Sequence, residues 1–306
     1  MDHWLRGMFT PLVTPFSGNA LDEPAFLRLV DWQIQEGADG IVLGSASGEG
    51  STLTDEERMR LLRLARAAAG PVYPMIAAAG SNATAQSVAD VRNATAAGAN
   101  AILLRLPYYN RPTQAGLVQH ILSVAAATSL PLIIDNDPER CAVELAPETL
   151  ADLAATPTIM GVLERRGDVA RCDRIMRSCS RHFMRLTGAG DTIPAYLASG
   201  GCGAITSIGN LAPRLLGRIR EACRIGSFEQ AQILQRRLVP LLGLTAREPD
   251  PVAIKLALSL QHPGISPACR LPLVTAAASL IEDLTYALDD LPRPISGRAA
   301  GQRSAA

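Results

Sequence analysis

The sequence predicts an α/β fold, a (β/α)8 TIM barrel with a C-terminal three-helix extension. Short, nearly continuous apolar runs alternate with segments of helical periodicity along most of the chain. Such runs are typical of a parallel sheet that is covered by helices. Eight strand–helix units close a barrel, and about 225 residues is close to the usual size of one. A doubly wound open sheet is the alternative.

The predicted elements follow one another in regular order. Strands are predicted near 8–13, 40–45, 72–78, 101–106, 131–135, 159–163, 182–187 and 203–208. Helices are predicted between them, near 21–36, 54–69, 82–97, 113–129, 146–155, 168–178, 191–199 and 212–225. Thr54 and Asn82 stand where helices should start, and Gly70, Gly98 and Gly226 stand where helices should end.

After Gly226 the pattern becomes purely helical, with helices predicted near 228–244, 250–261 and 270–288. The last stretch is rich in Pro, Gly, Ser and Ala, a composition typical of disorder. We therefore expect three parts, which are a barrel at 1–226, a helical extension at 227–289 and a disordered tail at 290–306.

The composition favours small-molecule chemistry. The 306 residues include 29 basic and 29 acidic side chains, so there is no basic excess for nucleic acid or an anionic membrane. No apolar run reaches the roughly 18 residues of a membrane span, and the start does not resemble a signal peptide. The six cysteines lack the spacing of a zinc site or a disulfide framework. A cytoplasmic protein is expected.

Polar residues at the C-terminal ends of the strands are the candidate site, because barrels of this class place their sites there. The stretch PLIIDNDPER (131–140) stands out, since Asp135 and Asp137 end an apolar strand. Ionised side chains are unfavourable there unless they are paired or used. The other candidates are Ser45, Ser47, Glu49, Tyr108, Tyr109, Asn110, Arg111, Arg140, Glu164, Arg165 and Arg166.

Four stretches resemble the dihydrodipicolinate synthase and N-acetylneuraminate lyase family of pyruvate-handling aldolases. They are GSASGEGSTLTDEE, PYYNRPTQAGLVQH, DNDPERCAVELAPETL and EPDPVAIKLAL. The resemblance implies a barrel with a three-helix extension, assembled as a tetramer of tight dimers. It also implies a lysine on the sixth strand that forms a Schiff base, a tyrosine in a Y-N-x-P turn that moves the proton, and a loop that grips the carboxylate.

This sequence departs from the family at those three places. Leu163 stands at the lysine position, Asp135 at the tyrosine position, and Ala46 at the first threonine of the loop, although Ser47 keeps a hydroxyl at the second. Leucine has no nucleophilic nitrogen. The only lysine, Lys255, matches a family position in the C-terminal helices, away from the barrel mouth. Imine-forming activity is therefore predicted to be absent.

Other family positions are retained. The resemblance implies that Tyr109 reaches across the tight dimer interface into the neighbouring site, and that Arg140 contacts a substrate carboxylate. It also implies that Gly188 and Ile205 line the pyruvate pocket. We therefore expect a small carboxylated ligand and a homo-oligomer, either a tetramer or a dimer.

Asp135 has two interpretations. It is either a general base or hydrogen-bond acceptor near Leu163, or it is paired with Arg105 on the fourth strand or Arg185 on the seventh. No cofactor is expected. The alternative is a Mg²⁺ ion held by Asp135, Asp137 and Glu49, without a histidine nearby.

Arg165 and Arg166 have two interpretations as well. They form either a solvated loop or a site that captures an anionic ligand.

Two functions remain open at this point. One is a lysine-independent lyase or hydratase on a small, keto-acid-like carboxylate, with Asp135 as base and Ser47, Arg140 and Arg105 as anchors. The other is a catalytically inactive ligand-binding or interaction protein on the aldolase scaffold. An enzyme should keep Asp135 open to a ligand, whereas an inactive descendant should have it locked to an arginine.

Overall fold

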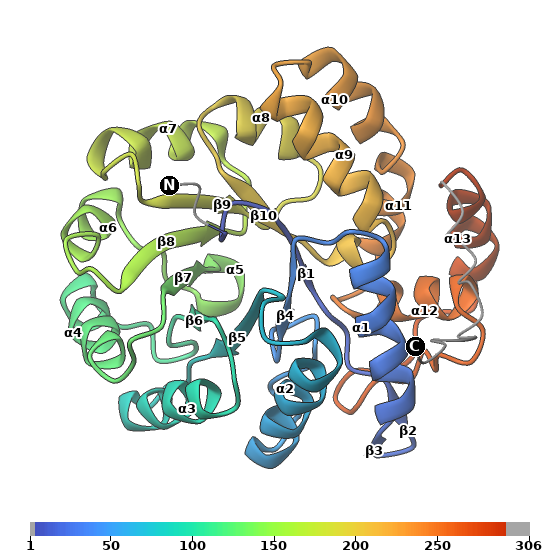
Figure 1. The fold of residues 1–306 in the computed structure, drawn as a ribbon, viewed down its shortest axis with the longest axis horizontal. Coiled ribbons are helices and arrows are strands. Elements are labelled where there is room, and N and C mark those ends of the chain that lie inside the picture. The colour runs from blue at the N-terminus through green and yellow to red at the C-terminus, as the bar shows by residue number, and fades with distance from the viewer. Residues whose placement is uncertain (1–3, 292–306) are drawn as a thin grey trace, which may run out of the picture.

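The computed structural model describes residues 4–291, and its strands form a closed parallel barrel (Figure 1). β1 pairs with β10 on one side and with β4 on the other, so the sheet has no free edge. The doubly wound alternative is therefore wrong. The barrel strands are β1 (Met8–Pro11), β4 (Gly40–Leu43), β5 (Met75–Ala79), β6 (Ala101–Arg105), β7 (Leu132–Asn136), β8 (Ile159–Glu164), β9 (Met184–Thr187) and β10 (Gly203–Ile205).

A ring of helices surrounds the barrel (Figure 1). Its members follow the strands in chain order, as expected for a (β/α)8 barrel. They are α1 (Glu23–Gln35), α2 (Asp55–Ala69), α3 (Thr84–Ala96), α4 (Gln114–Ala125), α6 (Pro147–Leu153), α7 (Val169–Ser178), α8 (Ile193–Ala198) and α9 (Pro213–Arg224). No helix among residues 4–291 combines the length and the apolar character that a bilayer crossing requires.

The helix signals in the sequence are confirmed at α2. The Thr54 side chain accepts a hydrogen bond from the backbone N–H of Glu57, and the Glu57 side chain accepts one from the backbone N–H of Thr54. This capping box satisfies two N–H groups that the first turn leaves unpaired. Gly70 ends the helix with φ of +75°, a conformation that favours glycine.

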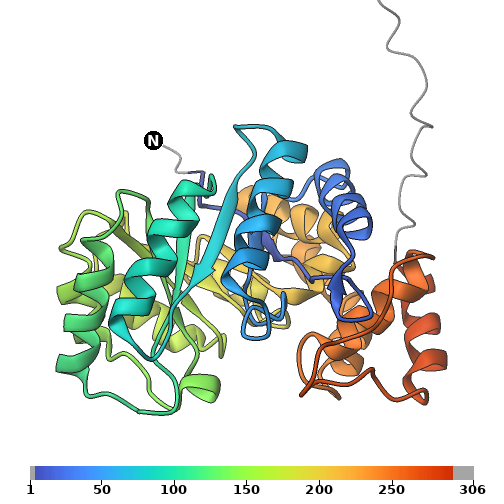
Figure 2. The same cartoon turned by 90° about the horizontal axis from the view of Figure 1, so that it is seen from below.

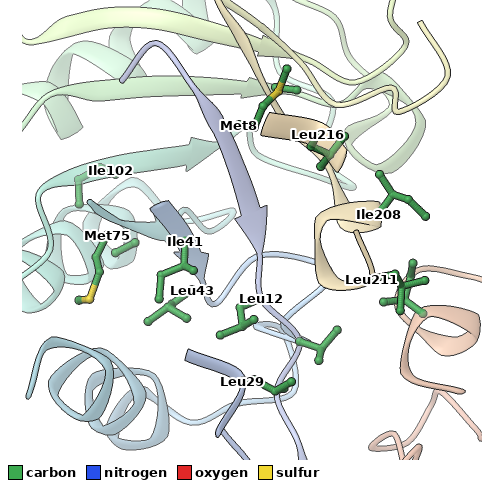
Figure 3. Close-up of a cluster of buried hydrophobic side chains, with 14 of the residues drawn as sticks. Met8, Leu12, Leu29, Ile41, Leu43, Met75, Ile102, Ile208, Leu211 and Leu216 are labelled. Atoms are coloured by element: carbon green, nitrogen blue, oxygen red, sulfur yellow. The ribbon is translucent and has the colours of Figure 1, made fainter. Parts of the chain in front are cut away.

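Two apolar layers form the core. Residues such as Met8, Ile41 and Ile102 pack between the strands and the helices (Figure 3). A second cluster, which includes Leu103, Ile133 and Leu163, fills the barrel interior. Side chains alternate between the two faces of a strand. The inward rows therefore continue at the mouth with the residues two positions further along, Arg105, Asp135 and Arg165.

Within residues 4–291, four helices follow the barrel. They are α10 (Phe228–Arg236), α11 (Val239–Thr245), α12 (Val252–Gln261) and α13 (Leu280–Asp289). α10 packs against α8 and α9, whereas the later three helices form a group beside the barrel (Figure 2). The single helix predicted at 228–244 is wrong, because α10 and α11 are separate. Pro240 has no N–H for the carbonyl four residues earlier, which explains the break.

The helix predicted at 270–288 begins only at Leu280. The preceding segment is held in another way, since the backbone N–H of Arg270 donates to Glu49 Oε2 at 2.8 Å and Pro272 has no N–H to donate. The strand predicted at 203–208 ends at Ile205 and continues as a 3₁₀ helix at Ser207–Asn210. The hairpin of β2 (Phe16–Ser17) and β3 (Ala20–Leu21) and the short α5 (Pro138–Cys141) were not predicted. Beyond Leu291, the predicted tail lies outside the described residues.

Candidate functional site at the barrel mouth

A cavity of about 300 Å³ lies at the C-terminal ends of the strands, between the barrel and the extension. Three of the predicted binding residues line it, namely Ala46 after β4, Arg105 at the end of β6 and Arg140 in α5. Asp250 and Leu273 close it from the extension. The cavity is thus built from segments far apart in the sequence.

Asp135 is paired with Arg165. Arg165 Nε donates to Asp135 Oδ1 at 2.7 Å, and Arg165 Nη2 donates to Asp135 Oδ2 at 2.9 Å. The carboxylate is buried and both of its oxygens are engaged. The predicted partners Arg105 and Arg185 are wrong, because the Arg185 guanidinium donates to the carbonyl oxygens of Phe183 and Gly200 instead.

The Arg165 side chain occupies the space over the inner barrel. A Cβ atom on Gly188 would lie 2.7 Å from Arg165 Cδ, so only glycine leaves room for this packing. The expectation of a solvated loop is wrong for Arg165, whose side chain is 18% exposed, whereas Arg166 is exposed. Leu163 and Ile205 are fully buried in the interior cluster and do not line the mouth cavity.

The loop after β4 turns its polar groups toward the protein. Ser47 Oγ donates to Asp250 Oδ2 at 2.5 Å. The backbone N–H groups of Gly48 and Glu49 donate to Ser45 and Ala46 within the turn. The Ser47 hydroxyl and these two N–H groups thus have partners within the protein.

Asp250 is a site residue that sequence reasoning missed. Its Oδ1 atom is buried and has no hydrogen-bond partner among the described residues. Burial raises the pKa of this carboxyl, and the bond from Ser47 opposes the shift. Asp250 lies in the extension, far along the chain from the barrel strands, so no local pattern in EPDPVAIK predicts that it lines the cavity.

Arg105 supplies positive charge to the cavity. It is half-buried, and its guanidinium makes no ion pair or hydrogen bond within residues 4–291. The hydrogen-bond donors of Arg105 are therefore not taken up by the described residues.

Arg140 is exposed, with Nε 3.6 Å from Asp137 Oδ2. Burial raises the pKa of Asp137, and the nearby Arg165 opposes that rise.

The only lysine is buried away from the cavity lining. Lys255 Nζ donates to Glu49 Oε1 at 2.6 Å and to the carbonyl oxygen of Thr14 at 2.9 Å. It also lies 4.5 Å from the centre of the Phe16 ring. Its side chain is 1% exposed, so the amine has no access to a ligand at the mouth.

The carboxylates proposed for Mg²⁺ are all engaged elsewhere. Glu49 binds Lys255 and the backbone of Arg270, and Asp135 binds Arg165. Within residues 4–291 no three His, Cys, Asp or Glu side chains lie close enough together to hold a metal ion. The residues present do not fit the magnesium alternative.

Tyr109 extends from the loop after β6. It is 89% exposed, and its φ of +69° is uncommon for a residue other than glycine. Its neighbour Tyr108 lines the cavity, and the Tyr108 backbone N–H donates to Asn82 Oδ1 at 2.9 Å. Asn82 therefore anchors this loop, although it was expected to start a helix that begins at Thr84.

Known proteins share this architecture. The model of the dihydrodipicolinate synthetase family matches residues 4–290. The 4-hydroxy-tetrahydrodipicolinate synthase of Brucella abortus biovar 1 is 39% identical over 286 residues, 93% of this chain and 97% of that protein.

Solved structures agree with this relationship. A monomeric dihydrodipicolinate synthase variant superposes with a TM-score of 0.91 at 32% identity, over 94% of this chain and 98% of its own. The chloride-inhibited enzyme of Acinetobacter baumannii in complex with pyruvate reaches 0.90 at 32% identity, over 93% and 98%. With this barrel, its C-terminal helices and these relatives, the chain belongs to the dihydrodipicolinate synthetase family.

Proposed function

We propose that this chain binds a small carboxylate at the barrel mouth non-covalently and does not form an imine with it. One observation carries the proposal. The only lysine is buried in an ion pair with Glu49, and a buried leucine stands at position 163. A Schiff base needs an accessible amine, and the side chains at the mouth offer none.

The charges around the cavity support a carboxylate ligand. Arg105 has no partner among the described residues, and Arg140 lines the same cavity. Guanidinium groups match carboxylates in geometry and charge. The volume of about 300 Å³ is at the lower end of small-molecule sites. The relative solved with pyruvate supports a keto-acid-like ligand.

The alternative of a lysine-independent lyase or hydratase has weaker support. It assigns the general base to Asp135, and a base must be able to take a proton from the substrate. Both Asp135 oxygens accept hydrogen bonds from Arg165. With both oxygens occupied by the Arg165 guanidinium, the carboxylate has no free oxygen directed at a substrate. An inactive binding protein fits this geometry better.

Borohydride trapping tests the absence of imine chemistry. Incubation with pyruvate and borohydride should leave the intact mass unchanged, because Lys255 is inaccessible. A reduced pyruvyl adduct on Lys255 would falsify the proposal. An active relative such as the Brucella synthase, treated in parallel, serves as the positive control.

Calorimetry with a panel of 2-keto and hydroxy acids tests binding. We expect Arg105→Ala to weaken binding at least tenfold, about 1.4 kcal/mol. Arg60→Ala, which removes an exposed arginine paired with Glu23 on the barrel surface, should leave binding unchanged. Equal affinities for both variants would refute the mouth site. Consumption of a bound acid, followed by NMR, would support the lyase or hydratase alternative.

We also propose that the chain forms at least a dimer, with a tetramer expected. An 89% exposed tyrosine held at positive φ is best explained by a contact with a second copy. The monomeric relative means that family membership alone does not decide the assembly. Light scattering at micromolar concentration should give a multiple of the chain mass. Tyr109→Ala should lower it, whereas Tyr286→Ala, another exposed tyrosine, should not. A single-chain mass for the unmodified protein would overturn this proposal.

A further inference from the structure

We propose that a second cavity, at the end of the barrel opposite the mouth, binds an aromatic monocarboxylate. This cavity has a volume of about 540 Å³. Its lining comes from segments that precede strands, such as Arg6 before β1, Asp39 before β4 and Cys202 before β10, and from Arg220 and Cys223 in α9. It shares no lining residue with the mouth cavity, so the two sites are separate.

Arg220 is held by the protein at the edge of this cavity. Its Nη2 atom lies 3.0 Å from Asp39 Oδ1, and its Nη1 atom donates to the carbonyl oxygen of Arg6 at 3.3 Å. These contacts hold the guanidinium in place. The buried Nε atom has no partner among residues 4–291. The Arg220 side chain as a whole is 34% exposed and lines the cavity, so the accessible part of its guanidinium can donate to a bound anion.

Positive side chains outnumber negative ones in the lining of this cavity. Three arginines contribute, of which Arg220 is paired with Asp39 and Arg224 with Glu221. Arg6 is the third, and its Nη2 atom donates a hydrogen bond to the carbonyl oxygen of Arg181 at 3.4 Å. The lining thus holds three arginines and one carboxylate, Asp39, so an anionic ligand matches the site, and a single carboxylate would meet Arg6.

The other part of the lining favours a flat apolar body. The indole of Trp4 is 39% exposed, and Pro74 and Leu197 also line the cavity. Cys202 and Cys223 add thiols, which behave as small apolar groups. A cavity of this size is far larger than a simple inorganic anion needs. An aromatic ring that packs beside Trp4, with its carboxylate directed toward Arg6 and Arg220, matches both the apolar and the charged residues of the lining.

Protection of the two cysteines tests the site in the full-length protein. The probe is 2-naphthoate, and N-ethylmaleimide labelling at about pH 8 is followed peptide by peptide. At ten times its dissociation constant the probe should slow labelling of Cys202 and Cys223 about tenfold. Cys179, which is half-buried but outside this cavity, should label at an unchanged rate.

Variants and a neutral analogue make the test specific. Arg6→Ala and Arg220→Gln should abolish protection, and 2-naphthalenemethanol, which has no charge, should protect neither cysteine. Arg214→Ala, on the same helix but paired with Glu36, should keep protection. Arg6→Ala keeps the test valid if Arg220→Gln fails to fold.

Three results would overturn the proposal. They are no protection at millimolar probe, equal protection by the neutral analogue, and protection that survives Arg6→Ala. The mouth cavity has no part in this experiment, so its outcome is independent of the proposed function.

Discussion

Two ion pairs near the barrel mouth differ in how deeply they are buried. In the Lys255–Glu49 pair the side chains are 1% and 0% exposed, whereas in the Arg165–Asp135 pair they are 18% and 8% exposed. The first joins α12 to the loop after β4, and the second lies across the top of the barrel interior. The lysine pair is enclosed by the protein, whereas the arginine pair is partly open to solvent.

The lysine pair is part of a larger structural contact. Phe16 lies between Lys255 and Arg270, at 4.5 and 4.4 Å from the ring centre, and cation–π attraction adds to the ion pair. The arginine pair lies at the C-terminal ends of β7 and β8, where the resemblance predicts a reactive lysine and tyrosine. A positive charge remains there, but on a guanidinium, which stays protonated in proteins and cannot act as an amine nucleophile. The lysine pair therefore lies within packed structure, and the cation of the arginine pair cannot form an imine.

The largest expected effect is on the lysine pair. Lys255→Met should lower the free energy of unfolding by about 3–5 kcal/mol, because it leaves Glu49 as a buried charge without its partner. Urea denaturation followed by circular dichroism measures this. The double variant Lys255→Met/Glu49→Gln should recover part of the loss, since the buried charge is gone. A loss below about 1 kcal/mol would mean that the pair is not the structural contact described here.

Removing Arg165 should have a smaller effect. Arg165→Met should lower the free energy of unfolding by about 2 kcal/mol, because Asp135 loses a charged partner but lies closer to solvent than Glu49. Thermal and urea unfolding provide the measurement. Adding Asp135→Asn should restore most of the difference. If Arg165→Met destabilised the protein more than Lys255→Met, the ranking of the two pairs would be reversed.

The pH dependence at Asp250 should be smaller still. Burial raises its pKa above the ordinary value of 3.8, so the folded state binds the proton more tightly than the unfolded state. This contribution to stability is fully present below that ordinary pKa and is lost as the pH rises through the folded pKa. Compared with Asp250→Asn, the unmodified protein should therefore lose stability between acidic and neutral pH. A difference between the two proteins that does not change with pH would contradict the burial argument.

No gain of synthase activity is expected from Leu163→Lys. Leu163 is the neighbour of Asp135 in the sheet, so a lysine there would meet a carboxylate rather than a tyrosine proton donor. Ala46 also leaves the carboxylate loop incomplete. A coupled synthase assay and borohydride trapping with pyruvate follow the outcome. Full turnover from this single change would show that Asp135 and Ala46 do not matter for the reaction.

The sequence by itself determined the barrel and which residue types stand at the ends of its strands. Alternating apolar strands and capped helices predict a parallel barrel because each element can bury its apolar face only in that arrangement. The absence of lysine at position 163 is visible without coordinates. The inward direction of Asp135 also follows from the two-residue period of its strand.

Only the tertiary structure decided which groups meet at the site. Arg105, Arg165 and Arg185 all lie near Asp135 by strand order, and the choice of Arg165 depends on packing over Gly188, which no local pattern encodes. Asp250 reaches the mouth from the distant extension. The cavity at the opposite end is lined by residues that precede β1, β4 and β10 and by residues of α9. Periodicity specifies the face of a residue, because it reflects local backbone geometry. The partner of a long charged side chain depends instead on contacts between distant parts of the chain.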